Sequence, residues 1–174
     1  MKNLKRVLSL GLASVMLAGM MVVGAGAANK DFTDADEITH VEAVNVMSTL
    51  GVLKGKDTGA FDPNTTVTRA EMAKIICVML NGGNDPTLGS AGSAMFSDIN
   101  GHWARPYIEY CASMNIIAGQ GNGTFAPDAP VTGAAAAKML LVAMGYDSSI
   151  FEFTGLDWEI NVNRRANEAK LYEE

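Results

Sequence analysis

The sequence has few basic residues and very few histidines, cysteines and aromatic residues. It contains 13 Lys and Arg against 19 Asp and Glu, and its formal net charge is −6 at pH 7. Sequence-independent nucleic-acid binding relies on clustered Lys and Arg, so this balance argues against a nucleic-acid partner. There is no His-Glu-x-x-His motif, no nucleophile elbow and no pair of cysteines at metal-ligand spacing. We therefore predict no enzyme, no cofactor and no metal, with a converging pair of carboxylates for glycoside hydrolysis as the open alternative.

The long apolar run lies at the N-terminus. "MKNLKR" carries three positive charges, "VLSLGLASVMLAGMMVVG" is apolar, and the small residues Ala25, Gly26 and Ala27 follow. This order is typical of a secretory signal peptide, so we predict a signal at residues 1–27 with cleavage after Ala27 or Ala28. An uncleaved membrane anchor is the alternative, because the run is near spanning length. Removal of the signal takes the formal charge from −6 to −9 and leaves a secreted chain without membrane contact.

The rest of the chain repeats itself at an offset of 64 residues. "FTD" at 32–34 aligns with "FSD" at 96–98, and "GAFDPNTTVTRAEMAKII" at 59–76 aligns without a gap with "GTFAPDAPVTGAAAAKML" at 123–140. Repetition of this kind indicates supersecondary units that complete each other's core. The predicted organisation is repeat 1 at 32–81, a Gly/Ser/Pro linker at 82–95, repeat 2 at 96–145 and a partial repeat 3 at 151–174.

Each repeat is predicted to be a helix, a turn-rich loop and a second helix, which makes the fold class all-α. The first helix of repeat 1 has apolar residues at helical spacing, and Gly51 or Asn115 stands where a left-handed cap ends the first helix of each repeat. Apolar positions of that helix in repeat 1 are Ile38, Val41, Val44, Met47 and Leu50. The chain ends where the loop of a third repeat is due, so we expect either a fragment or a degenerate last unit.

The second helices begin at a threonine in both repeats. Thr68 is a good N-cap, and Glu71 falls three residues later, where it closes a capping box. Repeat 2 keeps the cap at Thr132 but has Ala135 in place of the glutamate. Loss of this partner removes only a fraction of the cap's stabilisation, and Ala has high helix propensity, so the helix is expected to persist.

The two cysteines occupy apolar positions of the repeat. Cys77 aligns with Leu141, and Cys111 aligns with Met47. Free Cys packs like a small hydrophobic side chain, so both are predicted to lie in the core. A disulfide is the alternative, because the chain is predicted to be exported.

The combination of "FSD", "HWARPYIEY", "NIIAGQGNGTFAPDAPVT" and "VTRAEMAKII" at this spacing resembles the S-layer homology domain, over residues 32–172. The resemblance implies helix-loop-helix repeats packed with pseudo-threefold symmetry, the third repeat being incomplete. It implies a module that binds a pyruvylated secondary cell-wall polysaccharide, or a related peptidoglycan-linked polymer, at the cell surface. A structural surface-layer subunit that acts by self-assembly is the alternative.

In the family, the ligand lies in grooves between repeats, and the resemblance carries the groove arginine to Arg69 and the groove tryptophan to Trp103. A guanidinium in the first turn of a helix suits a carboxylate, and an indole suits a sugar ring. Gly133 replaces the arginine in repeat 2, so we expect one principal site, built from Arg69 and Trp103 together. The candidate ligand-binding residues are Arg69, Trp103, Thr68, Glu71, Gly55 and Asp98.

Each of these candidates also has a purely structural interpretation. Arg69 is then a surface or ion-paired residue, Trp103 a core aromatic and Gly55 a turn residue, and Asp98, like its counterpart Asp34, is a helix cap. A calcium site in the loop "GKDTGAFDPN" is a weaker alternative, since repeat 2 lacks the matching carboxylate and the spacing does not fit an EF-hand.

Overall fold

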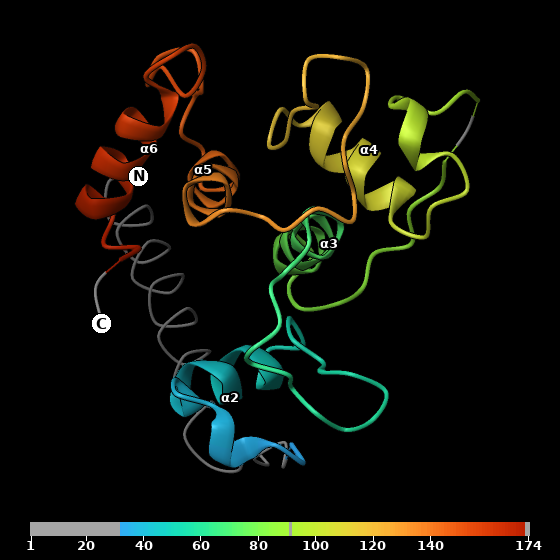
Figure 1. Cartoon of the computed structure of the whole chain (residues 1–174), viewed down its shortest axis with the longest axis vertical. Helices are drawn as coiled ribbons and strands as arrows, with labels where there is room; N and C mark the ends of the chain where they lie inside the picture. The colour runs from blue at the N-terminus through green and yellow to red at the C-terminus, as the bar shows by residue number, and fades with distance from the viewer. Residues whose placement is uncertain (1–31, 91, 173–174) are drawn as a thin grey trace, which may run out of the picture.

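The computed structural model describes residues 32–90 and 92–172, and its regular elements there are helical. The elements are η2 (Ala35–Glu37), α2 (Val41–Thr49), α3 (Arg69–Leu80), η3 (Ser97–Ile99), α4 (Arg105–Ser113), α5 (Gly133–Ala143) and α6 (Trp158–Glu168), as Figure 1 shows. The predicted all-α class is confirmed over this part of the chain. The predicted signal peptide, residues 1–27, lies outside the described residues.

The helix ends follow the local signals of the sequence. The Thr68 hydroxyl accepts a hydrogen bond from the Glu71 amide at 3.1 Å, and the Glu71 carboxylate accepts one from the Thr68 amide at 2.8 Å. This is the predicted capping box. Thr132 caps α5 alone, through a bond from the Ala135 amide of 3.2 Å. Gly51 has φ +77° and Asn115 has φ +57°, which confirms the left-handed ends of the two first helices.

The helices pair across repeats. The second helix of repeat 1, α3, packs against the first helix of repeat 2, α4, and α5 packs in the same way against α6. A smaller contact joins α3 to α5, which places α3 at the centre of the arrangement in Figure 1. Repeat 2 therefore supplies one helix to each of the two pairs, α4 to the first and α5 to the second. The pairs bury Ile76 and Ile108 in the first case and Leu141 and Val162 in the second.

Helix α2 differs from the sequence prediction. Ile38 and Val44 are buried in a small separate cluster, but Val41 is 45% exposed and Leu50 is 50% exposed. The predicted apolar face is thus only partly covered. The physical reason is that α2 has no contact with another described helix as extensive as the α3–α4 and α5–α6 contacts.

The segments that precede α3 and α5 run antiparallel and are hydrogen-bonded to each other. An isolated β-bridge joins Thr68 to Pro130. The Arg69 amide donates to the Ala129 carbonyl at 2.9 Å, and the Ala70 amide donates to the Pro127 carbonyl at 2.9 Å. These bonds fix the first turn of α3 against the loop of repeat 2, which determines where the Arg69 side chain lies.

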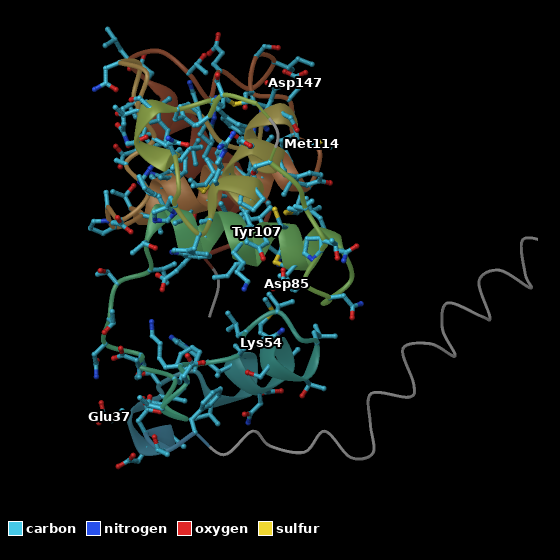
Figure 2. All side chains as sticks on the ribbon, turned by 90° about the vertical axis from the view of Figure 1, so that its right-hand side faces the viewer. Glu37, Lys54, Asp85, Tyr107, Met114 and Asp147 are labelled. Carbon is cyan, nitrogen blue, oxygen red and sulfur yellow. The ribbon has the colours of Figure 1, made fainter. Side chains whose placement is uncertain are left out.

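The segment between α3 and η3 returns to the α3–α4 pair. The Tyr107 hydroxyl donates a hydrogen bond of 2.7 Å to Asp85, and the two side chains lie together in Figure 2. Lys74 on α3 forms an ion pair of 3.0 Å with the same carboxylate. Burial, together with the bond to Asp85, raises the pKa of Tyr107 to about 12. The start of this segment is thereby tied to both helices.

Candidate functional site

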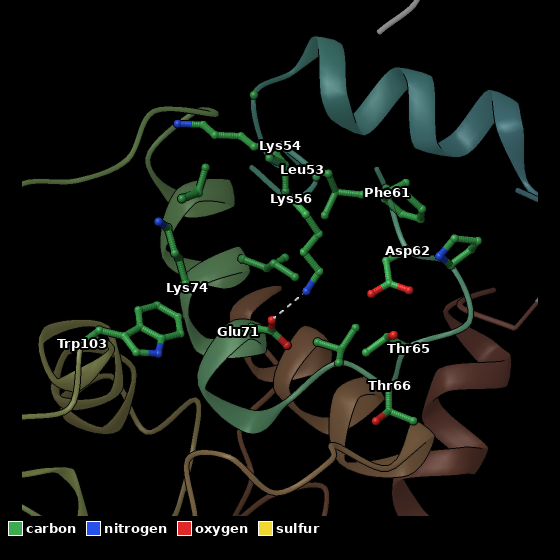
Figure 3. Close-up of a pocket in the computed structure, with 17 residues that line it drawn as sticks. Leu53, Lys54, Lys56, Phe61, Asp62, Thr65, Thr66, Glu71, Lys74 and Trp103 are labelled. Atoms are coloured by element: carbon green, nitrogen blue, oxygen red, sulfur yellow. Dashed lines mark hydrogen bonds and ion pairs between the residues drawn. The ribbon is translucent and has the colours of Figure 1, made fainter. Parts of the chain in front are cut away.

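Two grooves occupy equivalent positions in successive repeats. Groove 1, of about 330 Å³, lies between the loop of repeat 1, α3 and Trp103 (Figure 3). Groove 2, of about 510 Å³, lies between the loop of repeat 2, α5 and Trp158. Gly119, Ala135, Lys138 and Trp158 line groove 2 where Gly55, Glu71, Lys74 and Trp103 line groove 1.

Groove 1 mixes charges of both signs. Glu71 lines it and pairs with Lys56 at 3.5 Å, which is the dashed contact of Figure 3. Lys74 lines it and pairs with Asp85 at 3.0 Å, outside the groove lining. Asp62 adds a further carboxylate to the lining. With Lys54, the lining of groove 1 holds three lysines and two acids, and Lys56 and Lys74 are each paired with a carboxylate.

Groove 2 contains cations and no lining acid among the described residues. Its charged lining residues are Arg69 and Lys138. Ala135 stands where Glu71 stands in groove 1, so the loss of the glutamate in repeat 2 removes a carboxylate from this groove. In a chain of net charge −6, a lining with two cations and no acid is a local excess of positive charge, which favours an anion there.

Arg69 is held by the loop of repeat 2. Its Nε donates to the Phe125 carbonyl at 2.9 Å, and its Nη2 donates to the Ala118 carbonyl at 3.0 Å. The guanidinium carbon lies 4.4 Å from the centroid of the Phe125 ring. Burial lowers the pKa of Arg69, and the nearby Asp98 carboxylate works against that shift. Two of its five N–H groups bind carbonyls, and these bonds fix the orientation of the other three.

Lys138 lies on α5 beside Trp158. Its Nζ is 5.5 Å from the centroid of the indole ring, a cation–π geometry. Partial burial lowers the pKa of Lys138, and no described acid forms an ion pair with it. A bound anion would offset this desolvation, so Lys138 is suited to a charged ligand.

Arg69 and Trp103 do not share a groove. Arg69 lines groove 2, whereas Trp103 lines groove 1, so the expected site built from both is wrong. The reason is the pairing of α3 with α4: Trp103, just before α4, lies against the repeat 1 side of α3, while Arg69 reaches the repeat 2 loop. Trp103 is 53% exposed, so it is not a core aromatic either.

Gly55 and its counterpart Gly119 are required by packing. A Cβ at Gly55 would lie 2.5 Å from the Phe32 ring, and one at Gly119 would lie 2.6 Å from the Phe96 ring. Contacts under about 3 Å between carbon atoms are repulsive. The absence of a side chain therefore lets each phenylalanine ring close onto its loop, and the same loops line the two grooves.

Asp34 and Asp98 bind loop backbone. The Asp98 carboxylate accepts hydrogen bonds from the Phe125 and Ala126 amides at 2.8 and 2.7 Å. The Asp34 carboxylate accepts equivalent hydrogen bonds from the Phe61 amide at 2.8 Å and from the Asp62 amide at 2.7 Å. Neither side chain caps the short helix near it, so the interpretation of these aspartates as helix caps is wrong. Their function in the fold is to fix the Phe-containing loop.

The hydroxyl and amide of Thr68 are both bonded within the capping box. Glu71 is the other member of the box and also lines groove 1. Partial burial raises the pKa of Glu71, but hydrogen bonds from Thr68 and the ammonium of Lys56 outweigh it and lower the pKa overall.

Sequence reasoning missed Lys138 and Trp158 as site residues. Their signal was present, because Lys138 aligns with Lys74 and Trp158 aligns with Trp103.

Within residues 32–90 and 92–172, no three His, Cys, Asp or Glu side chains are grouped so that they would hold a metal ion. Over the same residues, no helix has the length and apolar character needed to cross a membrane.

Comparisons with known proteins agree with the repeat. Residues 31–73 and 96–137 match the S-layer homology domain. The S-layer protein sap of Bacillus anthracis is 30% identical over 147 residues, 84% of this chain and 17% of that protein. A protein named an uncharacterized cell wall amidase, from the same organism, is 28% identical over 85% of this chain and 27% of its own length.

A cellulosome-anchoring protein of Acetivibrio thermocellus is 38% identical over 81 residues, 46% of this chain and 18% of that protein. The chain thus spans less than a third of the length of each of these relatives. The matched segments contain both Phe-containing loops and the starts of α3 and α5, which line parts of the two grooves, whereas Lys138 and Trp158 of groove 2 lie outside them. The chain therefore belongs to the S-layer homology family and is a cell-surface protein.

Proposed function

We propose that this chain is a non-covalent anchoring module that attaches to the cell wall by binding an anionic, pyruvylated secondary cell-wall polysaccharide in groove 2. The observation that carries the proposal is the composition of that groove: two cations and an indole, with no lining acid among the described residues. Names of relatives, among them a cellulosome-anchoring protein, support an anchoring role.

Each groove 2 residue has a chemical task in this proposal. The free N–H groups of Arg69 bind a ketal carboxylate of the polymer. Lys138 adds a second positive charge, and the Trp158 ring packs against a sugar face. Gly119, which also lines the groove, lets the Phe96 ring close onto the loop, since a Cβ there would clash with that ring. Groove 1 is the weaker site, because the carboxylates of Glu71 and Asp62 offset part of the positive charge of its lysines.

The test compares matched substitutions in the two grooves. Binding of the exported protein to purified wall polysaccharide is measured by calorimetry, with the intact polymer and with polymer freed of its pyruvyl groups. Lys138→Ala and Trp158→Ala should each weaken binding about tenfold or more, on the scale of one lost charged hydrogen bond or ring contact. Trp103→Ala in groove 1 should change it little. Equal loss in Trp103→Ala, or undiminished affinity for depyruvylated polymer, would contradict the proposal.

The same experiment separates binding from catalysis. A binding module leaves the polymer at its original size, whereas a glycoside hydrolase or amidase releases fragments. We expect gel filtration of the recovered polymer to show no shortening after prolonged incubation.

Self-assembly is a second candidate function, and helix α2 is the observation that favours it. Val41, Val46 and Leu50 on or next to α2 are each about half exposed, at 45%, 47% and 50%. Apolar surface of this kind is typical of contacts with another chain or segment. Sedimentation of the protein without polymer tests it, because assembly would raise the apparent mass with concentration.

A further inference from the structure

Two thiols meet at the centre of the α3–α4 pair. Cys77 on α3 and Cys111 on α4 have their sulfur atoms 3.4 Å apart. Both are buried, with exposed fractions of 1% and 0%, and the structure contains them as free cysteines. Because α3 belongs to repeat 1 and α4 to repeat 2, this is a contact between repeats at their most extensive helix interface.

The surroundings of the two thiols do not suit a metal ion. No third metal ligand is grouped with them among the described residues. Each sulfur otherwise contacts a main-chain oxygen of the opposite helix, Tyr107 for Cys77 at 3.7 Å and Ala73 for Cys111 at 3.6 Å. The sulfur atoms, 3.4 Å apart, need to approach by only about 1.4 Å to reach the length of a disulfide.

We propose that Cys77 and Cys111 are joined by a disulfide in the exported protein, which covalently links repeat 1 to repeat 2. The proposal rests on the cell-surface location of the chain, since disulfides form and persist outside the reducing cytosol. It does not depend on which polymer the grooves bind.

The bond forms by thiol–disulfide exchange with a disulfide-bearing oxidant, either an oxidoreductase or a small molecule RSSR. One cysteine thiolate attacks a sulfur of RSSR, which gives a mixed disulfide and releases RS⁻. The second cysteine thiolate then attacks the protein sulfur of that mixed disulfide and releases the second RS⁻. The two protein thiols lose two protons and two electrons, and RSSR becomes two RSH.

This exchange takes place before α3 and α4 close. Contact with the Cys77 sulfur and burial raise the pKa of the Cys111 thiol, so in the folded protein it is protonated, shielded and unreactive. Once formed, the disulfide is shielded from reductants for the same reason. It closes a loop that contains the end of α3, the segment 82–95 and most of α4, and it thereby restricts the unfolded chain.

The decisive experiment counts thiols in the protein exported by a bacterial host. The protein is denatured without reductant and treated with iodoacetamide, and its peptides are analysed by mass spectrometry. We expect neither cysteine to be alkylated and a linked pair of peptides containing Cys77 and Cys111, lighter by two hydrogens than the reduced pair. Two alkylated cysteines would overturn the proposal.

Thermal stability gives an independent readout. Reduction of the denatured protein followed by refolding under reductant should lower the melting temperature by about 10 °C relative to the oxidised form, on the scale of a loop of this length. The double variant Cys77→Ala, Cys111→Ala should show no response to reductant. An equal melting temperature of the oxidised and reduced wild-type forms would contradict a stabilising link between the repeats.

Discussion

The guanidinium of Arg69 covers the ring of Phe125, with 4.4 Å between the guanidinium carbon and the ring centroid, and Nε donates to the carbonyl of the same residue at 2.9 Å. Arg69 belongs to repeat 1 and Phe125 to repeat 2. The residue that the family resemblance assigns to the ligand is therefore also a structural contact between repeats. Its substitution is expected to affect both stability and binding, whereas Lys138 offers a way to separate the two.

Replacement of Arg69 by alanine should lower the free energy of unfolding by about 2 kcal/mol, because it removes charged hydrogen bonds to the Phe125 and Ala118 carbonyls. Urea denaturation measures this change. Lys138→Ala, which breaks no described hydrogen bond or ion pair, should stay within about 0.5 kcal/mol of the wild type and still lose polymer binding. A larger stability loss in Lys138→Ala than in Arg69→Ala would refute this assignment.

Replacement of Gly119 by alanine should destabilise the protein by about 1–3 kcal/mol, because the new Cβ would lie 2.6 Å from the Phe96 ring and 2.7 Å from the Thr124 carbonyl oxygen. Gly133→Ala is the matched control. It adds a Cβ with nothing within 4 Å at the start of α5, and it should be neutral or slightly stabilising. Thermal unfolding of both variants, followed by circular dichroism, is the measurement; similar melting temperatures would show that the Phe96 ring moves freely.

The caps of α3 and α5 should contribute similar amounts. Thr68→Ala and Thr132→Ala each remove a side-chain bond to an N3 amide, of 3.1 Å and 3.2 Å, and each should cost about 1 kcal/mol. Glu71→Ala should cost less than Thr68→Ala, because the equivalent box position of α5 is alanine in this chain. Chemical denaturation gives the free energy of unfolding of each of the three variants. A larger loss of stability in Glu71→Ala than in Thr68→Ala would show that the contact of Glu71 with Lys56 contributes more than the cap.

Stability should decline in acid. The pKa of Asp34 is lowered, mainly by the hydrogen bond that its carboxylate accepts from the Phe61 amide. Desolvation raises the pKa of Asp98, but bonds from the Phe125 and Ala126 amides outweigh it, and the net shift is downward. Because these pKa values are lower in the folded than in the unfolded chain, the unfolded chain binds more protons in acid. Their stabilisation is complete above about pH 4, the ordinary aspartate value, and is lost as the pH falls through the lowered values.

Melting temperatures measured from pH 7 down to pH 2 test this expectation. Asp98→Asn should be less stable at neutral pH and should lose less on acidification, since one of the titrating carboxylates is gone. If the melting temperature of Asp98→Asn falls as steeply below pH 4 as that of the wild type, other groups control the acid transition.

Features set by neighbouring residues were predictable from the sequence. The register of the repeats, the capping threonines and the left-handed helix ends at Gly51 and Asn115 depend on side chains within a few positions of each other. Local chemistry of this kind leaves a pattern in the chain, and the structure confirms it. The sequence alone thus determined an all-α repeat protein.

The composition of the grooves was decided by tertiary structure. Whether Arg69 meets Trp103 or Trp158 depends on which helices pair, and α3 pairs with α4 while its first turn binds the repeat 2 loop. The exposure of α2 and the contact between Cys77 and Cys111 depend on the same pairing. Such contacts join residues tens of positions apart, and they are selected by the packing of whole apolar faces, which no short stretch of sequence encodes by itself.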